Sequence, residues 1–229
     1  MTATIAPVPF WKRLSDVLLC SLGLVALAPV FLLAAALVRL SSPGPVFYRA
    51  RRAGYRGAPF DVLKFRTMHL GADAQGAITG KNDPRVFAAG RLLRLFKIDE
   101  LPQLWNVIRG EMSVVGPRPE DVEIVEECYT AEQRRVLELA PGLTGLPQVR
   151  FFPEFPQPDA SEVDPERYYR EVILPMRLRL DLEYAETRTF WMDARLILAT
   201  IWLIAVKSWV ARLGRPVTAK APADSELPA

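Results

Sequence analysis

Two adjacent carboxylates, Asp99 and Glu100, are the residues of this chain that most suggest chemistry. They follow a basic stretch and precede a Pro-Arg-Pro sequence, at the point where a helix is expected to begin. An aspartate in such a position is usually only an N-cap, and that interpretation stays open for Asp99. A second role is favoured by the cations that lie close to the pair in sequence or on neighbouring predicted elements: Lys64, Arg66, Arg91, Arg94, Lys97 and Arg118.

An excess of cations around two carboxylates indicates an anionic third party, and phosphate fits best. Arginine binds phosphate through paired hydrogen bonds, and helix N-termini favour negative charge. Mg²⁺ usually binds one or two carboxylates together with substrate phosphates, which suits an acid pair. A zinc site is not indicated, because the chain has one histidine and no clustered cysteines. No Walker-type or Gly-x-Gly-x-x-Gly loop is present.

The charge is concentrated at the N-terminus. Residues 1–60 carry seven basic side chains against Asp16 alone, a net +6, whereas the whole chain of 229 residues carries +3. A basic arm on a mildly acidic body suits an anionic lipid surface or a phosphate-rich ligand. Nucleic acid is not indicated, because no basic and aromatic stripe continues through the body. The two cysteines, Cys20 and Cys128, do not form a disulfide framework, and a reducing compartment is the simpler interpretation.

A membrane segment is predicted over the 22 uncharged residues from Val17 to Val38. Its length suffices to cross a bilayer, but Pro29 interrupts the middle and both flanks are basic. Basic flanks prefer the cytoplasmic side, so a re-entrant hairpin that bends at Ala28-Pro29 and leaves by the face it entered satisfies both. A straight single span remains an alternative. A secretory signal fits less well, because its apolar region is usually only about 7 to 15 residues.

The remaining elements are predicted from periodicity and turn signals. Residues 46–68 favour a β-hairpin through Gly54 and Gly57-Ala58-Pro59, with Lys64 and Arg66 on one face. Residues 88–97 form a short basic amphipathic helix, either at a lipid interface or packed on the core. A helix face formed by Leu101, Leu104, Trp105 and Ile108 ends at Gly110, Pro119 opens an acidic helix, and Thr130 with Gln133 forms a capping box.

Two C-terminal segments stay ambiguous. The sequence from Met176 to Tyr184 alternates with period two like a strand, although Pro175 would equally open a helix. The apolar run from Leu196 to Val206 is too short to span a bilayer and is either an interfacial helix or a buried core helix.

Several motifs together resemble one known family. They are Lys12-Arg13 with Asp16 before an apolar hairpin, Lys64-Phe65-Arg66-Thr67, Asp99-Glu100-Leu101-Pro102-Gln103-Leu104, Gly116-Pro117-Arg118-Pro119, Pro141-Gly142-Leu143-Thr144-Gly145 and Gln148-Val149. From about Lys12 to about Val206 the chain resembles the bacterial sugar transferases, the monotopic phosphoglycosyl transferases that start glycan assembly. We expect one of the small members, because no multi-span region precedes the hairpin.

The resemblance implies transfer of a phosphosugar from a UDP-sugar to a polyprenyl phosphate such as undecaprenyl phosphate, with release of UMP. It implies that Asp99 is the nucleophile, forms an aspartyl-phosphosugar intermediate and has Mg²⁺ beside it, while Glu100 orients or deprotonates the incoming group or helps to hold the metal. Arg118 would clamp phosphate, with Lys64, Arg66 and Arg150 as helpers. Asp181 and Tyr184 match a later family motif without an assigned role.

The resemblance also implies a monotopic protein of the bacterial inner (cytoplasmic) membrane whose active site faces the cytoplasm, with membrane lipid as a partner and a homodimer left open. The expected fold is α+β and mainly helical: the membrane hairpin in residues 1–40, a compact catalytic domain with a small β-hairpin and amphipathic interfacial helices in residues 41–212, and a disordered tail in residues 213–229. The family often has serine before the bend proline, where this chain has Ala28. The proline-rich loop from Phe151 to Pro165 is also unlike the family, so the sugar stays unassigned.

Two other functions remain open. One is a non-catalytic scaffold at the membrane surface, and the other is a metal-dependent phosphohydrolase.

Overall fold

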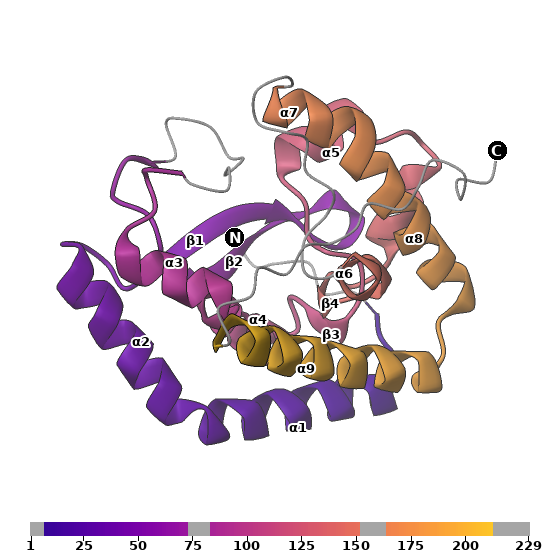
Figure 1. The fold of residues 1–229 in the computed structure, drawn as a ribbon. Coiled ribbons are helices and arrows are strands. Elements are labelled where there is room, and N and C mark those ends of the chain that lie inside the picture. The colour runs from indigo at the N-terminus through magenta and orange to yellow at the C-terminus, as the bar shows by residue number, and fades with distance from the viewer. Residues whose placement is uncertain (1–6, 73–82, 152–163, 213–229) are drawn as a thin grey trace.

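The computed structural model describes residues 7–72, 83–151 and 164–212. In this part of the chain the fold is mainly helical, with two small two-stranded sheets, as expected for an α+β protein (Figure 1). The predicted tail at residues 213–229 and most of the predicted proline-rich loop lie outside the described residues. The helices are α1 (Phe10–Ala26), α2 (Ala28–Ser41), α3 (Ala88–Leu95), α4 (Gln103–Arg109), α5 (Val122–Cys128), α6 (Leu146–Arg150), α7 (Pro165–Tyr168), α8 (Leu174–Thr187) and α9 (Phe190–Arg212).

The N-terminal apolar segment forms two helices, α1 and α2, that meet at an angle of 64°. The break lies at Leu27, one residue before the predicted bend at Ala28-Pro29. Pro29 occupies the first turn of α2, where an amide needs no intrahelical partner, so the proline forces the interruption just ahead of itself. Among the described helices, none is alone long and apolar enough to cross a bilayer, and only this bent pair meets that measure together.

Helix α1 has its polar residues inside and its apolar residues outside. Lys12, Asp16 and Cys20 follow one another at every fourth position and are buried against the protein. The opposite face exposes apolar side chains, with Phe10 at 81% and Leu22 at 68% exposure. A surface helix of a water-soluble protein shows the reverse pattern. The outer face of α1 is therefore suited to hydrocarbon.

The predicted β-hairpin is present. Strands β1 (Phe47–Ala53) and β2 (Pro59–Phe65) pair antiparallel, and the tight turn η1 (Tyr55–Gly57) joins them. Arg56 and Gly57 both adopt positive φ in this turn. The hairpin packs on α4, and the Asn106 side chain of that helix bonds the backbone of Asp61 and Leu63 in β2.

A second, parallel pair joins β3 (Ser113–Val115) to β4 (Gly142–Thr144). Gly116 and Gly142 lie in backbone contact beside this pair, because the Gly142 amide donates to Pro117 O at 2.8 Å and the Gly116 amide to Thr144 O at 2.9 Å. A Cβ on Gly142 would lie 2.2 Å from the Gly116 nitrogen, so only glycine fits there. This contact fixes the start of the Gly116-Pro117-Arg118 segment.

The ambiguous segment from Met176 to Tyr184 is helical and belongs to α8. Leu174, Arg177, Leu178, Leu180, Asp181 and Tyr184 are buried at helical spacing. The helical period was hidden because two of these buried positions, Arg177 and Asp181, carry charged side chains. Pro175 does not begin the helix, since α7 and the π-helical turn η5 (Tyr169–Ile173) run directly into α8. A π turn is one way for a helix to accommodate the amide that proline lacks.

Two further local predictions have different outcomes. The capping box is confirmed, because the Thr130 amide donates to Gln133 and the Gln133 amide donates to Thr130, at the start of η4 (Gln133–Glu138). The prediction that Pro119 opens the acidic helix is wrong, because α5 begins at Val122 behind Asp121, whose carboxylate caps the Glu123 amide.

The backbone contact at Gly142 leads to the first prediction. Gly142→Ala would place a methyl group inside the Gly116 backbone, and we expect a loss of about 3 kcal/mol or more in the free energy of unfolding. Thermal unfolding in detergent should then fall by roughly 10 °C. Gly23→Ala is the matched control, because its Cβ would meet only Leu104 Cδ1 at 3.5 Å, an ordinary contact. Equal unfolding temperatures for the two variants would contradict this account of the β3–β4 junction.

Candidate active site

The acid pair lies in the 3₁₀ turn η3 (Ile98–Glu100), which follows Lys97 in the left-handed conformation. Asp99 does not cap α4: that helix starts at Gln103, behind Pro102, without a side-chain cap. The N-cap interpretation is therefore wrong, because the extra turn places the carboxylate too early in the chain. Asp99 is instead 8% exposed, and its Oδ1 atom is buried without a hydrogen-bond partner among the described residues.

Glu100 pairs with two cations through one of its carboxylate oxygens. Arg118 Nη2 donates to Glu100 Oε1 at 2.8 Å, and Lys64 Nζ lies 3.6 Å from the same oxygen. Burial alone would raise the pKa of Glu100, but the charges of Arg118 and Lys64 hold it well below its ordinary value. Glu100 is thus a fixed anion, and its cationic neighbours are fixed with it.

Asp99 has a different electrostatic environment. Burial and the charge of Glu100 raise the pKa of Asp99, while Lys64, Lys97 and Arg94 lower it. The structure therefore brings together the acid pair and four of the cations predicted to surround it. Glu100 is paired with cations within the protein through Oε1, whereas Asp99 Oδ1 has no partner among the described residues and can accept a cation or an electrophile.

Two of the predicted phosphate-binding residues are not brought to this site. Arg66 is 5% exposed, and its guanidinium donates to Ser42 Oγ, Ser42 O and Pro45 O at 2.7 to 2.8 Å. Arg66 stabilises the turn after α2 through these hydrogen bonds. Unlike Lys64, it is not paired with the acid pair in the described part of the chain. Arg150 lies exposed at the end of α6, and among the described residues it joins none of the contacts of the acid pair.

A cavity of about 220 Å³ opens beside Lys64 and Arg118. The prediction from sequence missed two polar residues of its wall: Arg177 belongs to the segment that the pattern left ambiguous, and Tyr169 lies just before it in η5. Arg177 lies 2.5 Å from Glu120, and the Tyr169 hydroxyl donates to the same carboxylate. Four cations line the cavity with one acid and several apolar side chains: Arg52, Lys64, Arg118, Arg177, Glu120, Val62, Gln103, Pro119, Ile124 and Tyr169.

Asp181 is buried behind this wall. Its Oδ2 lies 3.8 Å from Arg177 Nε, too far for a hydrogen bond, and both of its oxygens lack a partner among the described residues. Burial raises the pKa of Asp181 to about 7, although Arg177 opposes the shift. Because Arg177 is already neutralised by Glu120, little charge is left to hold Asp181 ionised.

The donor set for a metal is small. No group of three or more His, Cys, Asp or Glu side chains that could bind a metal occurs among the residues the structure describes. Asp99 Oδ1 is the orphaned carboxylate oxygen of the acid pair, and Glu100 is occupied by Arg118 and Lys64. One carboxylate completed by substrate phosphates is a donor set that fits Mg²⁺ and does not fit structural zinc.

Comparison with known proteins gives matches over most of the chain. Residues 8–207 match the family model described as bacterial sugar transferase. Over 196 residues the chain is 41% identical to a UDP-glucose:undecaprenyl-phosphate glucose-1-phosphate transferase of Caulobacter vibrioides, which covers 83% of this chain and 68% of the relative. It is 47% identical over 154 residues to the exopolysaccharide production protein ExoY of Rhizobium meliloti, covering 60% of this chain and 68% of that protein.

A further relative is longer than the chain. The UDP-glucose:undecaprenyl-phosphate glucose-1-phosphate transferase of Escherichia coli is 35% identical over 199 residues. The alignment covers 83% of this chain but only 39% of that relative. The similarity thus spans most of this chain and a part of the longer protein.

The buried carboxyl of Asp181 leads to a pH prediction. Between its ordinary pKa of 3.8 and about 7, the unfolded chain ionises Asp181 while the folded chain keeps the proton. The stability of the wild type therefore falls as the pH rises through this window, and the loss is complete above about pH 7. We expect Asp181→Asn to be more stable than the wild type by up to roughly 4 kcal/mol at pH 7.5, with a difference that vanishes near pH 4.

Denaturant unfolding at several pH values measures this difference. Glu186→Gln, an exposed change on the same helix, is the control and should show no such trend. A difference between Asp181→Asn and wild type that does not change with pH would refute the assignment.

Proposed function

The chain belongs to the bacterial sugar transferase family and is a phosphoglycosyl transferase, and on this basis we propose that it transfers a phosphosugar from a UDP-sugar to a polyprenyl phosphate, releasing UMP, through a covalent intermediate on Asp99. The single observation that supports the intermediate best is the buried, unpartnered Oδ1 of Asp99 beside a carboxylate that is already paired with Arg118. Two relatives are named for UDP-glucose, so UDP-glucose is the first donor to test.

The proposed reaction has two displacements at one phosphorus atom. Asp99 Oδ1 attacks the phosphorus that bears the sugar, the bond to the UMP oxygen breaks, and UMP leaves with that electron pair. An oxygen of the polyprenyl phosphate then attacks the same phosphorus, and the bond to Asp99 breaks to restore the carboxylate. Covalent catalysis lets a water-soluble donor and a lipid acceptor use one site in turn.

Glu100 acts as a positioning residue in this proposal and not as a base. A carboxylate whose pKa is held well below its ordinary value is a weak proton acceptor. The acceptor phosphate is itself anionic, so it needs no strong base. Glu100 instead fixes Arg118 and Lys64, whose charges can neutralise the phosphate oxygens of the bound donor.

We propose Asp99 as the protein ligand of Mg²⁺, completed by phosphate oxygens of the donor. When bound, the ion would neutralise phosphate charge and polarise the phosphorus towards attack. The cavity lined by Arg52, Lys64, Arg118 and Arg177 adds positive charge beside the acid pair, which suits a diphosphate donor.

The chain is proposed to be a monotopic protein of the bacterial cytoplasmic membrane with its active site facing the cytoplasm. The bent α1–α2 pair, the apolar outer face of α1 and the basic residues on both flanks support a re-entrant hairpin. Leu92 and Leu95 on α3 and Trp202 on α9 are also exposed, which suits helices lying at the lipid interface. The acceptor phosphate would then meet Asp99 at the boundary between lipid and water.

Asp99→Asn tests the covalent step. Wild-type protein incubated with UDP-glucose and Mg²⁺, without lipid, should gain the mass of a phosphosugar on Asp99, as seen by intact-protein and peptide mass spectrometry. Asp99→Asn should lose the adduct and at least about 10³-fold in UMP release, because it removes the nucleophile. Asp61→Asn is the control, since Asp61 is a surface carboxylate whose side chain pairs with the exposed Arg51.

Other outcomes of this experiment identify other functions. Free sugar phosphate released without lipid would indicate a phosphohydrolase. Lipid-linked product formed by Asp99→Asn would refute the covalent role, and no product from any UDP-sugar would favour a non-catalytic scaffold.

The hairpin topology is tested by cysteine labelling. Pro7→Cys and Arg49→Cys, two exposed positions, are each placed in a Cys128→Ser background that retains the buried Cys20. Both should react with a membrane-impermeant maleimide in inside-out vesicles. Neither should react in spheroplasts, because both ends of a re-entrant hairpin face the cytoplasm. Labelling of the two positions from opposite sides would restore the straight span.

A further inference from the structure

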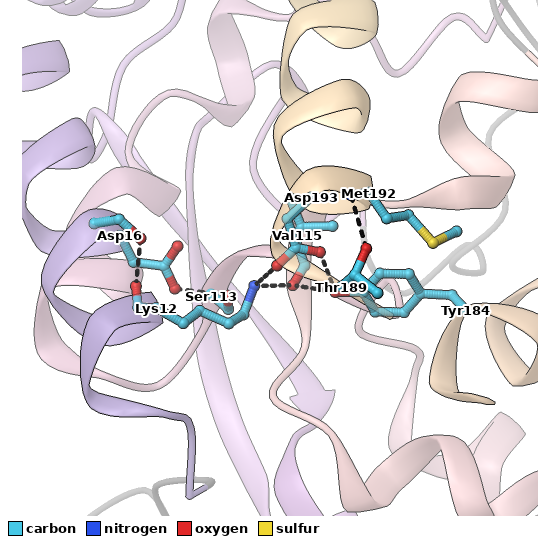
Figure 2. Close-up of polar contacts among 9 residues, drawn as sticks. Lys12, Asp16, Ser113, Val115, Tyr184, Thr189, Met192 and Asp193 are labelled. Carbon is cyan, nitrogen blue, oxygen red and sulfur yellow. Dashed lines mark hydrogen bonds and ion pairs between the residues drawn. The ribbon is translucent and has the colours of Figure 1, made fainter. Parts of the chain in front are cut away.

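The side chains of Lys12 and Tyr184 meet at one backbone carbonyl of β3, and both donate to Asp193 (Figure 2). Lys12 of α1 donates to Asp193 Oδ2 of α9 at 2.5 Å and to Val115 O at 3.3 Å. The Tyr184 hydroxyl of α8 donates to Asp193 Oδ1 at 2.7 Å and also contacts Val115 O at 3.4 Å. Lys12, Tyr184 and Asp193 are all buried, so this cluster is largely shielded from water.

The same helix also holds the start of the strand. Ser113 Oγ donates to Asp16 Oδ2 at 2.6 Å, one turn beyond Lys12 on the buried face of α1. Strand β3 is therefore tied to the membrane-facing helix at both of its ends. The strand has only three residues, so these side chains constrain all of its length.

The segment that follows β3 carries the phosphate-binding arginine. Arg118 is three residues after Val115, and the contacts of Gly116 and Pro117 with β4 leave little freedom between them. Arg118 ends this segment in its hydrogen bond with Glu100. A displacement of Val115 would therefore be transmitted to Arg118.

A simple join between α1 and α9 does not require an ion pair. Burying two charges is costly and often gives no net gain in stability, so an apolar contact would join the helices equally well. A buried ion pair is directional, because the remaining N–H donors of its lysine must be satisfied by acceptors at fixed positions. Here those groups include the carbonyl of Val115. The geometry fits a positioning device better than a simple join between helices.

We propose that Lys12, Tyr184 and Asp193 form a buried anchor that fixes β3 between the membrane hairpin and α9 and thereby positions Arg118 for the phosphate of the donor. The kinetic part of this proposal rests on the proposed function. The three residues act through Arg118 and are positioning residues.

The kinetic test uses Asp193→Asn and the milder Tyr184→Phe, each alone and combined with Arg118→Lys, in full-length protein in lipid nanodiscs. We expect Asp193→Asn to raise the KM for the UDP-sugar roughly tenfold with kcat changed less than about threefold, because donor binding is weakened throughout. In combination with Arg118→Lys, Asp193→Asn should lower kcat/KM by no more than about a further twofold. Independent effects would instead multiply, and that result would overturn the proposal.

Two controls separate positioning from general destabilisation. Val125→Ala lies in a different core cluster and should lower the unfolding temperature without changing KM. Glu186→Gln changes an exposed carboxylate of α8 and should change neither quantity. A KM increase for Val125→Ala as large as that for Asp193→Asn would reduce the anchor to a stability effect.

Hydrogen exchange tests the anchor without any turnover. In Asp193→Asn, peptides that cover residues 113–118 should exchange roughly tenfold faster, while those that cover residues 59–65 in β2 keep the wild-type rate. Unchanged exchange over residues 113–118 in both Asp193→Asn and Tyr184→Phe would refute the anchor. If Asp193→Asn shows this pattern of exchange but the wild type uses no UDP-sugar, the proposed function fails while the anchor stands.

Discussion

The pairing of Glu100 with Arg118 at 2.8 Å and with Lys64 at 3.6 Å decides what the neighbouring carboxylate can do. Two adjacent buried acids would normally compete for the same cations, and the less favoured one would take up a proton. Here Glu100 takes the cations and Asp99 is left with an unpartnered oxygen. A nucleophile or a metal ligand needs such an oxygen. The backbone from η3 through β3 to Arg118 holds Glu100 and Arg118 in their pairing and thereby maintains the difference between the two carboxylates.

The sequence predicted the acid pair, the bend in the N-terminal apolar segment and the turn of the β-hairpin because each rests on local signals. Proline and paired basic flanks indicate the bend, glycines indicate the turn, and adjacent residues in one turn necessarily lie close together. The bend lies at Leu27 and not at Ala28-Pro29, since the proline can begin a helix but cannot extend one. Asp99 is not a cap, because a 3₁₀ turn separates it from α4.

Sequence patterns did not predict which distant residues pair with Arg66, Arg177 and Tyr184. Lys64 and Arg66 are two residues apart, yet the first pairs with Glu100 and the second with Ser42, because the strand ends at Phe65. Arg177 could not be placed while its segment could be either strand or helix, so its part of the cavity wall was missed. The role of Tyr184 depends on Asp193, whose significance appears only when α1, β3 and α9 are packed together.

The inverted polarity of α1 has a consequence for biogenesis. Lys12 and Asp193 are separated by 181 positions, so a ribosome makes the α1–α2 pair long before the carboxylate that neutralises its lysine. Asp16 likewise has no Ser113 to pair with until 97 positions later. The polar face of α1 therefore lacks both partners until β3 and α9 have been made. For a bent pair that enters the membrane as proposed, insertion would be coupled to the folding of these later elements.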